Sequence, residues 1–526
     1  MRSTLRMVFA ASALVVPALL FGGAAAQDAR GVLAAADKAT GASKVTSIQY
    51  TGTGWIAFLG QNFSTVDDWP RVDLKTYTAT IDYENKAASE DYIRVQGKNA
   101  AKGGGAGFPI QGEPRTQNFV NGVAAWTLNA QGQPQAQDDQ AELRQFMMWV
   151  SPHGFIKAAM QDRNAQVSTR HFVKTGQTFR VIGFTTMGKY RATAEINEEN
   201  LPERIVTWVP NPVMGDMQIE IRYENWRDVG NGVKFPGLIH MHQGDHPFVR
   251  GMNFMNLNVS DVKVNVPNAT PALPDTVRNA EVPRINVTTT QLSPGVWLLA
   301  GGSHNSVAIE FKDYIALVEA PLNDARTNAV IDAAKRVIPN KPIRYLLNTH
   351  HHWDHSGGIR AAAAEGATII THASNDDFYE EVVLAPQPRT LGPDRLASFP
   401  FATTGPGPQK LETFEERYAL SDGTQTAVMY HLEGLNHAGD MAVVYLPGPK
   451  LLISADMGPP AAGTPAANVA ANAVALYNNI RRLKLDVTTH VPIHGAPSPH
   501  AQFEQIVGPV AASRAAAGGA GGGGGE

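Results

Sequence analysis

The stretch that decides the fold of this chain is Asn348-Thr-His-His-His-Trp-Asp-His-Ser-Gly-Gly358. It follows Ile343-Arg-Tyr-Leu-Leu347, an apolar run of strand length, and it precedes residues 359–365, which are good helix formers. The pattern predicts a turn between a buried strand and a helix. Side chains alternate along an extended chain, so His350 and His352 are expected on one side and His351 on the other.

The charged and aromatic residues of this turn predict a metal site. Asp354 and His355 follow where the chain turns, and Gly357 and Gly358 are expected to adopt backbone conformations closed to other residues. Imidazoles and a carboxylate packed this closely would waste hydrogen-bonding capacity without a cation between them, and they suit zinc. The alternative is a set of unrelated buried histidines.

Further residues of the same types follow downstream. His437 lies before the strand-like run 441–446, Asp456 ends the apolar run 451–456, and His494 ends Val491-Pro-Ile-His494. Each stands at the end of a predicted strand, where a sheet presents side chains to a crevice. Together with these residues, the spacing His350-x-His352-x-Asp354-His355 resembles the signature of the metallo-β-lactamase superfamily.

The resemblance covers roughly residues 285–510 and implies a four-layer αβ/βα sandwich with two zinc ions. It implies that the first metal is held by His350, His352 and His437, and the second by Asp354, His355 and His494, with Asp456 bridging them. The implied function is zinc-dependent hydrolysis of a small molecule by a metal-bridging hydroxide. Asp354 is the expected catalytic residue, orienting the hydroxide and accepting its proton. The bond is an ester, lactone, amide, sulfate or phosphate bond.

Other functions stay open at this point. The chain contains no cysteine, which excludes the β-lactamases that bind a metal through one, but a β-lactam hydrolase of another type remains an alternative. A mononuclear iron oxygenase is a second alternative. A non-catalytic periplasmic protein that binds a lipid or another ligand is the third.

Length and composition suggest a secreted protein of two domains. At 526 residues the chain is too long for one ordinary core. Residues 1–26 have the pattern of a secretory signal, with Arg2 and Arg6, an apolar stretch, and Ala24-Ala-Ala26. That stretch is short for a membrane span, so a bacterial periplasmic or secreted protein is expected, with an uncleaved anchor as the alternative. The formal net charge of -4 indicates no nucleic-acid partner, and oligomeric state stays unknown.

The overall class is expected to be α+β, with an antiparallel β-rich domain over residues 27–280. Runs of alternating polar and apolar residues, such as 46–51 and 217–223, recur between turn residues. The pattern resembles the curved half-barrel of periplasmic lipoprotein carriers. Such a sheet could bind an apolar ligand, or it could wall one side of the catalytic cleft, and we favour the wall.

A Pro-rich segment over residues 264–283 predicts a linker between the domains. The catalytic domain is then expected over residues 281–512, and the Ala- and Gly-rich residues 513–526 are expected to form a flexible tail.

Some polar residues near the expected site have two interpretations each. His304 either faces the substrate or forms part of a turn, and Asp440 either orients His437 or is a solvated turn residue. Glu319 is expected to support the metal-bearing turn. The segment His240-Met-His242-Gln-Gly-Asp245-His246 superficially repeats the metal motif. Its Asp-His pair comes one residue late, so a half-exposed strand and its turn are favoured there.

Overall fold

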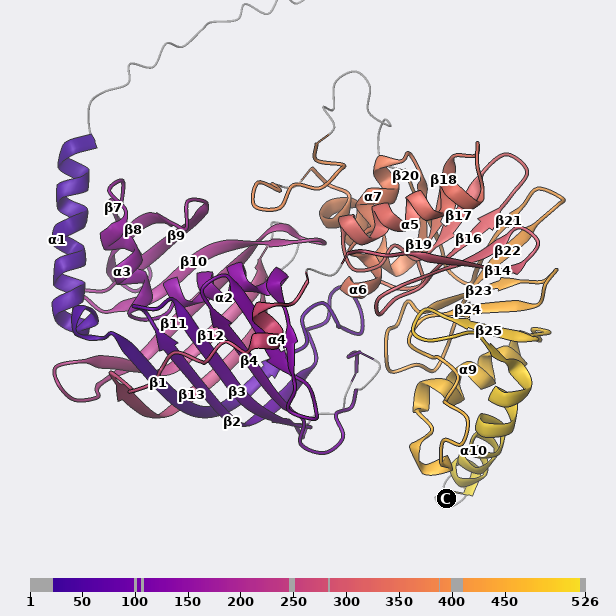
Figure 1. Ribbon diagram of the computed structural model, residues 1–526, viewed down its shortest axis with the longest axis horizontal. Coiled ribbons are helices and arrows are strands. Elements are labelled where there is room, and N and C mark those ends of the chain that lie inside the picture. The colour runs from indigo at the N-terminus through magenta and orange to yellow at the C-terminus, as the bar shows by residue number, and fades with distance from the viewer. Residues whose placement is uncertain are drawn as a thin grey trace, which may run out of the picture.

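The computed structural model describes residues 22–98, 102–105, 108–245, 251–281, 284–386, 388–398 and 410–520. Two units lie side by side (Figure 1). We call them the N-terminal region (β1–β13 with α1–α4) and the C-terminal sandwich (β14–β26 with α5–α10). The predicted α+β class, with an antiparallel β-rich first half, is confirmed. Residues 1–21 of the predicted signal lie outside the described residues.

The N-terminal region is built on one 13-stranded antiparallel sheet in which each strand pairs with its neighbours in sequence. There are two exceptions. β1 pairs with β13, the last strand of the sheet, and β6 does not pair with β7, so these two are the edge strands. The strands are β1 (Ser47–Ala57), β2 (Arg71–Asp82), β3 (Ala87–Val95), β4 (Arg115–Asn121), β5 (Ala124–Leu128), β6 (Pro134–Ala136), β7 (Gln166–His171), β8 (Thr178–Thr186), β9 (Tyr190–Ile196), β10 (Pro202–Asn211), β11 (Gly215–Asp228), β12 (Lys234–Asp245) and β13 (Met252–Val264).

Helices cover one face of this sheet. They are α1 (Gly22–Thr40), the turn η1 (Ala42–Lys44), α2 (Asp138–Trp149), α3 (Gly154–Gln161) and α4 (Asp275–Arg278). The ring of Phe146 on α2 stacks on Tyr190 of β9 with ring centroids 4.1 Å apart, and both side chains are buried. Helix α4 lies in the segment for which the sequence predicts an extended linker.

The C-terminal sandwich contains two further sheets. The first has the order β14-β15-β16-β17-β18-β19-β20, and its last four strands run parallel. Its strands are β14 (Thr288–Ser293), β15 (Val296–Ala300), β16 (Ser306–Glu310), β17 (Ile315–Val318), β18 (Ile343–Leu347), β19 (Thr368–His372) and β20 (Lys410–Phe414). The second sheet contains β21 (Arg417–Ser421), β22 (Thr426–His431), β23 (Ala442–Leu446), β24 (Leu451–Ser454), β25 (Thr489–Pro492) and β26 (Ser498–Pro499).

Helices flank both sheets of the sandwich (Figure 1). Those near the first sheet are α5 (Asp324–Val337), α6 (Trp353–Ser356), α7 (Ile359–Ala364), η2 (Ala373–Asn375), α8 (Asp376–Phe378) and η3 (Tyr379–Val383). Those in the chain after β24 are η4 (Ala466–Asn468), α9 (Ala471–Arg482) and α10 (His500–Ala520). Helix α10 runs beyond residue 512, so helix occupies the first part of the segment predicted as a flexible tail.

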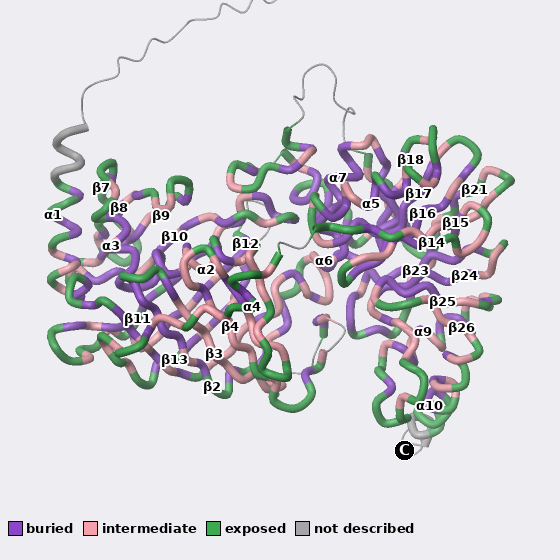
Figure 2. The backbone as a smooth tube through the Cα atoms, in the orientation of Figure 1, coloured by how far each residue is buried: buried purple, intermediate pink, exposed green. Residues whose placement is uncertain are grey.

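Three layers of apolar contact explain the four-layer arrangement. In β17, Ile315 and Leu317 pack toward the α5 and α7 side, whereas Ala316 and Val318 pack between the two sheets. In β23, Val443 joins the layer against α9 and α10, whereas its neighbours face the other sheet. Both faces of these strands are therefore buried (Figure 2), which is why their sequences are continuously apolar rather than alternating.

The two units pack closely against each other. The Arg389 guanidinium donates to the backbone oxygens of Pro212 and Val213, at 2.9 Å each. The Asp216 carboxylate accepts hydrogen bonds from the backbone nitrogens of Thr390 and Leu391, each at 3.0 Å. One cluster of buried apolar residues also includes side chains of both units. The two sheet systems therefore share buried apolar contacts.

Among the described helices, none is long and apolar enough to cross a membrane.

Candidate metal centre

The residues predicted as ligands all follow strands of the sandwich. His350 and His352 come directly after β18, and Asp354 and His355 lie in the short helix α6. The remaining three are on the loops after β22, β24 and β25: His437, Asp456 and His494. Since these loops open at one edge of the paired sheets, the side chains meet there.

The first group consists of His350, His352, His437 and Asp456, whose ligand atoms all lie within 4.8 Å of one another. The Nε2 atoms of His350 and His437 are 3.3 Å apart. Ligands bound about 2.0–2.1 Å from a tetrahedral zinc ion lie about 3.3–3.4 Å from each other. The spacing of this group therefore fits one tetrahedrally coordinated cation.

The second group consists of His304, Asp354, His355 and His494, also with ligand atoms within 4.8 Å of one another. The Nε2 atoms of His355 and His494 are 3.3 Å apart, and His304 Nε2 lies 3.4 Å from Asp354 Oδ2. The side chains of Asp354 and His494 are 34% and 32% exposed, whereas that of His350 is fully buried. Solvent and small molecules therefore reach the centre from the side of the second group.

The Asp456 carboxylate touches both groups. Its Oδ2 atom lies 3.2 Å from His350 Nε2 and 2.9 Å from His355 Nε2. Its Oδ1 atom lies 3.0 Å from His494 Nε2. Asp456 has a left-handed backbone conformation, with φ of 52°, which Asp tolerates better than most residues. The strand end thus turns this carboxylate into the space between the two sets of imidazoles.

Hydrogen bonds at the other ring nitrogen fix the tautomers of three histidines. His352 Nε2 lies 2.9 Å from the backbone oxygen of Asn62, and His494 Nδ1 lies 2.9 Å from that of Ser303. His355 Nδ1 lies 2.6 Å from Glu319 Oε2. A carbonyl or carboxylate oxygen only accepts, so each of these nitrogens carries the proton and the opposite nitrogen keeps its lone pair. Histidines that bind metals are usually held in this way.

The electrostatics of the centre favour positive charge between the two groups. Burial lowers the pKa of His350 to about 4, and burial also lowers the pKa of His352 well below its ordinary value. Both are therefore neutral, as metal ligands must be. Burial lowers the pKa of His355, but the carboxylates of Asp456 and Glu319 outweigh this effect and raise the pKa well above its ordinary value. The negative charge of these carboxylates also favours a metal cation beside His355 Nε2.

The two glycines that end the motif have a different role from the one predicted. Gly357 and Gly358 have φ values of -63° and -105°, which any residue adopts. A Cβ atom on Gly357 would lie 2.2 Å from the Leu322 backbone oxygen, and one on Gly358 would lie 1.9 Å from Thr327 Oγ1. Close packing against the start of α5 and the segment before it, and not backbone conformation, requires glycine here.

This arrangement matches a known family. Residues 299–495 match the family model of the metallo-β-lactamase superfamily. They form a metallo-β-lactamase superfamily domain. Members of this superfamily are generally hydrolytic metalloenzymes that act on small molecules, and the domain carries two groups of His and Asp side chains that could hold a metal ion.

Several solved structures that resemble part of this chain carry the name metallo-β-lactamase. One, from Pontibacter korlensis, is 18% identical with a TM-score of 0.33, over 43% of this chain and 99% of its own. One from Hirschia baltica is 22% identical with a TM-score of 0.32, over 43% and 97%. The mono-zinc form of FIM-1 from Pseudomonas aeruginosa is 20% identical with a TM-score of 0.31, over 43% and 96%. No curated protein matches the chain.

The structure also corrects and completes the residues around the superfamily centre. His304 faces Asp354 in the second group, so it lies at the site and not only in a turn. Asp440 is buried and orients His351, with its Oδ1 atom 2.8 Å from His351 Nδ1, so both predicted roles for Asp440 are wrong. Glu319 supports the metal-bearing turn as predicted, since its Oε1 atom also accepts from the Thr349 nitrogen at 2.8 Å.

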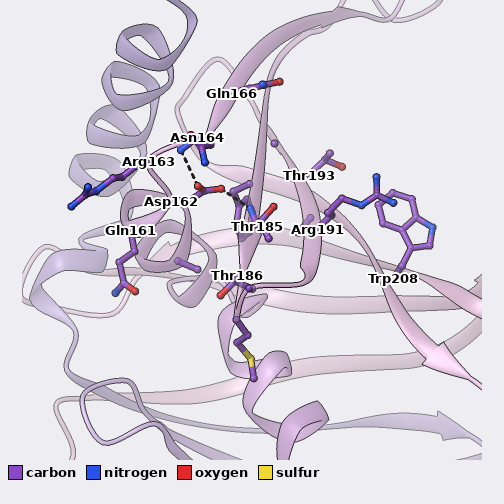
Figure 3. Close-up of a pocket in the computed structure, with 16 residues that line it drawn as sticks. Gln161, Asp162, Arg163, Asn164, Gln166, Thr185, Thr186, Arg191, Thr193 and Trp208 are labelled. Atoms are coloured by element: carbon purple, nitrogen blue, oxygen red, sulfur yellow. Dashed lines mark hydrogen bonds between the residues drawn. The ribbon is translucent and has the colours of Figure 1, made fainter. Parts of the chain in front are cut away.

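Two other places in the N-terminal region lack such an arrangement. In the segment that superficially repeats the motif, His240 Nε2 lies 3.1 Å from His242 Nε2 and 3.0 Å from Asn253 Oδ1. His246 lies outside the described residues, and no group of potential metal ligands forms there among the described ones. A cavity of about 820 Å³ beside α3 and β8 (Figure 3) is lined by polar side chains such as Asp162, which accepts from the Thr185 nitrogen at 2.7 Å. Its lining includes none of the ligand candidates.

Proposed function

We propose that this chain is a zinc-dependent hydrolase that binds two metal ions and cleaves an ester, lactone, amide, sulfate or phosphate bond in a small molecule. His350, His352 and His437 would hold the first ion, and Asp354, His355 and His494 the second. The observation that carries the proposal is the place of Asp456, whose two carboxylate oxygens reach histidines of both groups at 2.9–3.2 Å. His304 is an additional candidate beside the second ion.

Zinc, when bound, acts as a Lewis acid and lowers the pKa of water to about 7, so that hydroxide is available at neutral pH. The side chains of the centre supply the rest. Asp354 lies at the exposed side, where its Oδ2 atom accepts a hydrogen bond and orients a nucleophile. Burial raises the pKa of Asp354, but the imidazoles of His355 and His304 lower it by more. Asp354 therefore stays a carboxylate. His304, whose ring centroid lies 4.1 Å from that of His494, flanks the approach and can contact an oxygen of the substrate.

A substrate panel with metal analysis tests this function. The full chain is loaded with Zn²⁺ and assayed on chromogenic esters, lactones, sulfates, phosphodiesters and β-lactams. We expect two zinc ions per chain and turnover of at least one non-β-lactam class, which a chelator abolishes and added Zn²⁺ restores. Turnover of β-lactams alone would favour the β-lactam hydrolase. One iron and no zinc after mild purification would favour the mononuclear iron oxygenase.

The support that Glu319 gives His355 leads to a prediction for metal affinity. In Glu319→Gln one of the two acceptors becomes a donor that faces His355 Nδ1 or the Thr349 nitrogen, both of which donate. Loss of such a partner typically lowers metal affinity by about 10–100-fold. We expect this loss in a chelator competition assay with Zn²⁺. Glu380→Gln, at an exposed position in the same domain, serves as the control and should bind as the parent does.

A second candidate function belongs to the N-terminal region. A cavity of about 430 Å³ lies between α2 and the sheet, within the size range of small-molecule sites. Its lining is mostly apolar and includes Leu143, Met147, Ile221 and Met241. This observation favours an apolar ligand, such as a long-chain fatty acid, alongside the role of this region as a wall.

Binding of a fluorescent long-chain fatty acid to the full chain tests this second function. We expect saturable binding of one molecule per chain. Ala88→Phe, which fills the cavity from β3, should weaken it at least about 10-fold, since a well-packed site does not accept extra volume. Ala130→Phe, at an exposed position, is the control. Binding that is absent, or equal in both variants, would leave this region with the role of a wall.

We also propose that the protein is periplasmic or secreted. The proposal is supported by the signal pattern of residues 1–26. Fractionation of a bacterium that expresses the full chain tests it. We expect the protein in the periplasm or the medium, with residues 1–26 missing from its N-terminus. Recovery of the intact chain from the cytoplasm would contradict it.

A further inference from the structure

We propose that Gln61 and Asn62 of the N-terminal region are positioning residues of the metal centre. They lie on the connection between β1 and β2, almost three hundred residues before the motif in sequence. This inference rests on the proposed metal-dependent hydrolysis. It assigns to the N-terminal region a part in the geometry of the centre, beyond walling its cleft.

Gln61 orients the carboxylate of Asp354. The Gln61 side-chain Nε2 donates to Asp354 Oδ1 at 2.7 Å. The other carboxylate oxygen, Oδ2, faces His304 and His355 in the second group. A carboxylate with one oxygen held by an amide has only one orientation for its second oxygen. Gln61 therefore determines which oxygen of Asp354 faces the metal and the nucleophile.

Asn62 fixes the ligand nitrogen of His352. Its backbone oxygen accepts from His352 Nε2 at 2.9 Å, which makes Nε2 the protonated nitrogen. His352 Nδ1 is buried and has no hydrogen-bond partner among the described residues, so its lone pair is left for a metal. The Asn62 side chain holds this backbone in place, because its Nδ2 donates to the oxygens of Ser64 and Asp67, at 2.5 and 3.2 Å.

The same connection is docked by backbone contacts on both sides of these two residues. The Trp353 nitrogen donates to the Gly60 oxygen at 3.2 Å, and the Gly439 nitrogen donates to the Phe63 oxygen at 2.7 Å. Gly60 has φ of 70°, and a Cβ atom there would lie 2.2 Å from the Trp353 ring. The contacts reach the loops of both metal groups, α6 and the loop that carries His437. A shift of this connection would therefore disturb both groups at once.

The test measures metal binding in the full chain, with Co²⁺ as a spectroscopic probe and Zn²⁺ in chelator competition. Gln61→Met keeps the length of the side chain and removes its donor. We expect affinity for the second ion to fall by about 10–100-fold, as for other residues that orient a ligand. The visible spectrum of the second Co²⁺ should change, and kcat should fall with KM nearly constant. Gln166→Met, exposed on β7, is the matched control.

A second variant separates docking from the side chain of Gln61. Gly60→Ala should weaken binding of both ions, because the added methyl group collides with Trp353. Gly122 also has a positive φ, 57°, but a Cβ atom there meets no atom within 4 Å. The Gly122→Ala variant should therefore bind both ions as the parent does. Thermal unfolding of all four variants identifies any that does not fold. If a variant does not fold, Asn62→Ala replaces it, and this substitution should weaken binding of the first ion.

The outcomes distinguish this inference from the proposed function. A parent protein that binds fewer than two ions overturns the proposed function, and this inference with it. A parent that binds two ions, together with folded Gln61→Met and Gly60→Ala variants of unchanged affinity and spectrum, overturns this inference alone. Losses of the expected size in these variants and not in their controls support it.

Discussion

Asp354→Asn should lower kcat by about 10²–10⁴-fold, the usual contribution of a group that orients a nucleophile and accepts its proton. The substitution keeps the shape of the side chain but replaces one acceptor oxygen by a donor. Gln61 Nε2 donates to Asp354, so the one oxygen that the introduced amide retains is expected to turn toward Gln61. The amide nitrogen then faces the second group, where a carboxylate oxygen is needed. The effect should appear in kcat more than in KM, because the interaction is made chiefly in the transition state.

The measurements are zinc content, kcat and KM on whichever substrate the panel identifies. Asp376→Asn, at an exposed position in the same domain, is a matched control and should keep the activity of the parent. Near-normal kcat in Asp354→Asn with full zinc content would remove Asp354 from the mechanism. Loss of one zinc ion together with kcat would show that Asp354 acts mainly as a ligand.

Asp440→Ala should lower the free energy of unfolding by about 3–5 kcal/mol, the cost of removing a charged acceptor from a buried hydrogen-bonded network. The Asp440 carboxylate accepts from the backbone nitrogen and the Nδ1 atom of His351, each at 2.8 Å, and from Asn375 Nδ2 at 2.6 Å. Burial raises the pKa of Asp440, but the His351 imidazole lowers it by more. The Asp440 carboxyl group is therefore charged. Its removal leaves three buried donors without this partner.

Denaturant unfolding measures this effect, with and without chelator so that stability from bound metal is kept separate. Asp376→Ala is the control, and it should change the free energy of unfolding little. A double-mutant cycle with His351→Ala isolates the pair, because each single change leaves a buried polar partner. The double mutant should be less destabilised than the sum of the two single mutants. A loss below about 1 kcal/mol in Asp440→Ala, the value expected of an exposed pair, would contradict this prediction.

The sequence by itself determined the sandwich and seven of the eight potential metal ligands that meet at its edge among the described residues. Local spacing places His350, His352, Asp354 and His355 on one turn, and strand-length apolar runs next to His437, Asp456 and His494 place these at strand ends. Strand ends at the same edge of two paired sheets meet in space whatever the lengths of the loops between them. Such residues can therefore be found from their order and their neighbours alone.

Only the tertiary structure decided what surrounds these ligands. Gln61 and Asn62 come from the N-terminal region and lie in no recognisable motif, and Asp440 pairs with His351 because the loops after β18 and β22 contact each other. Gly357 and Gly358 are explained by distances to Leu322 and Thr327, which no backbone preference reveals. Contacts between segments far apart in the chain depend on how whole sheets pack, and a linear pattern carries no record of that packing.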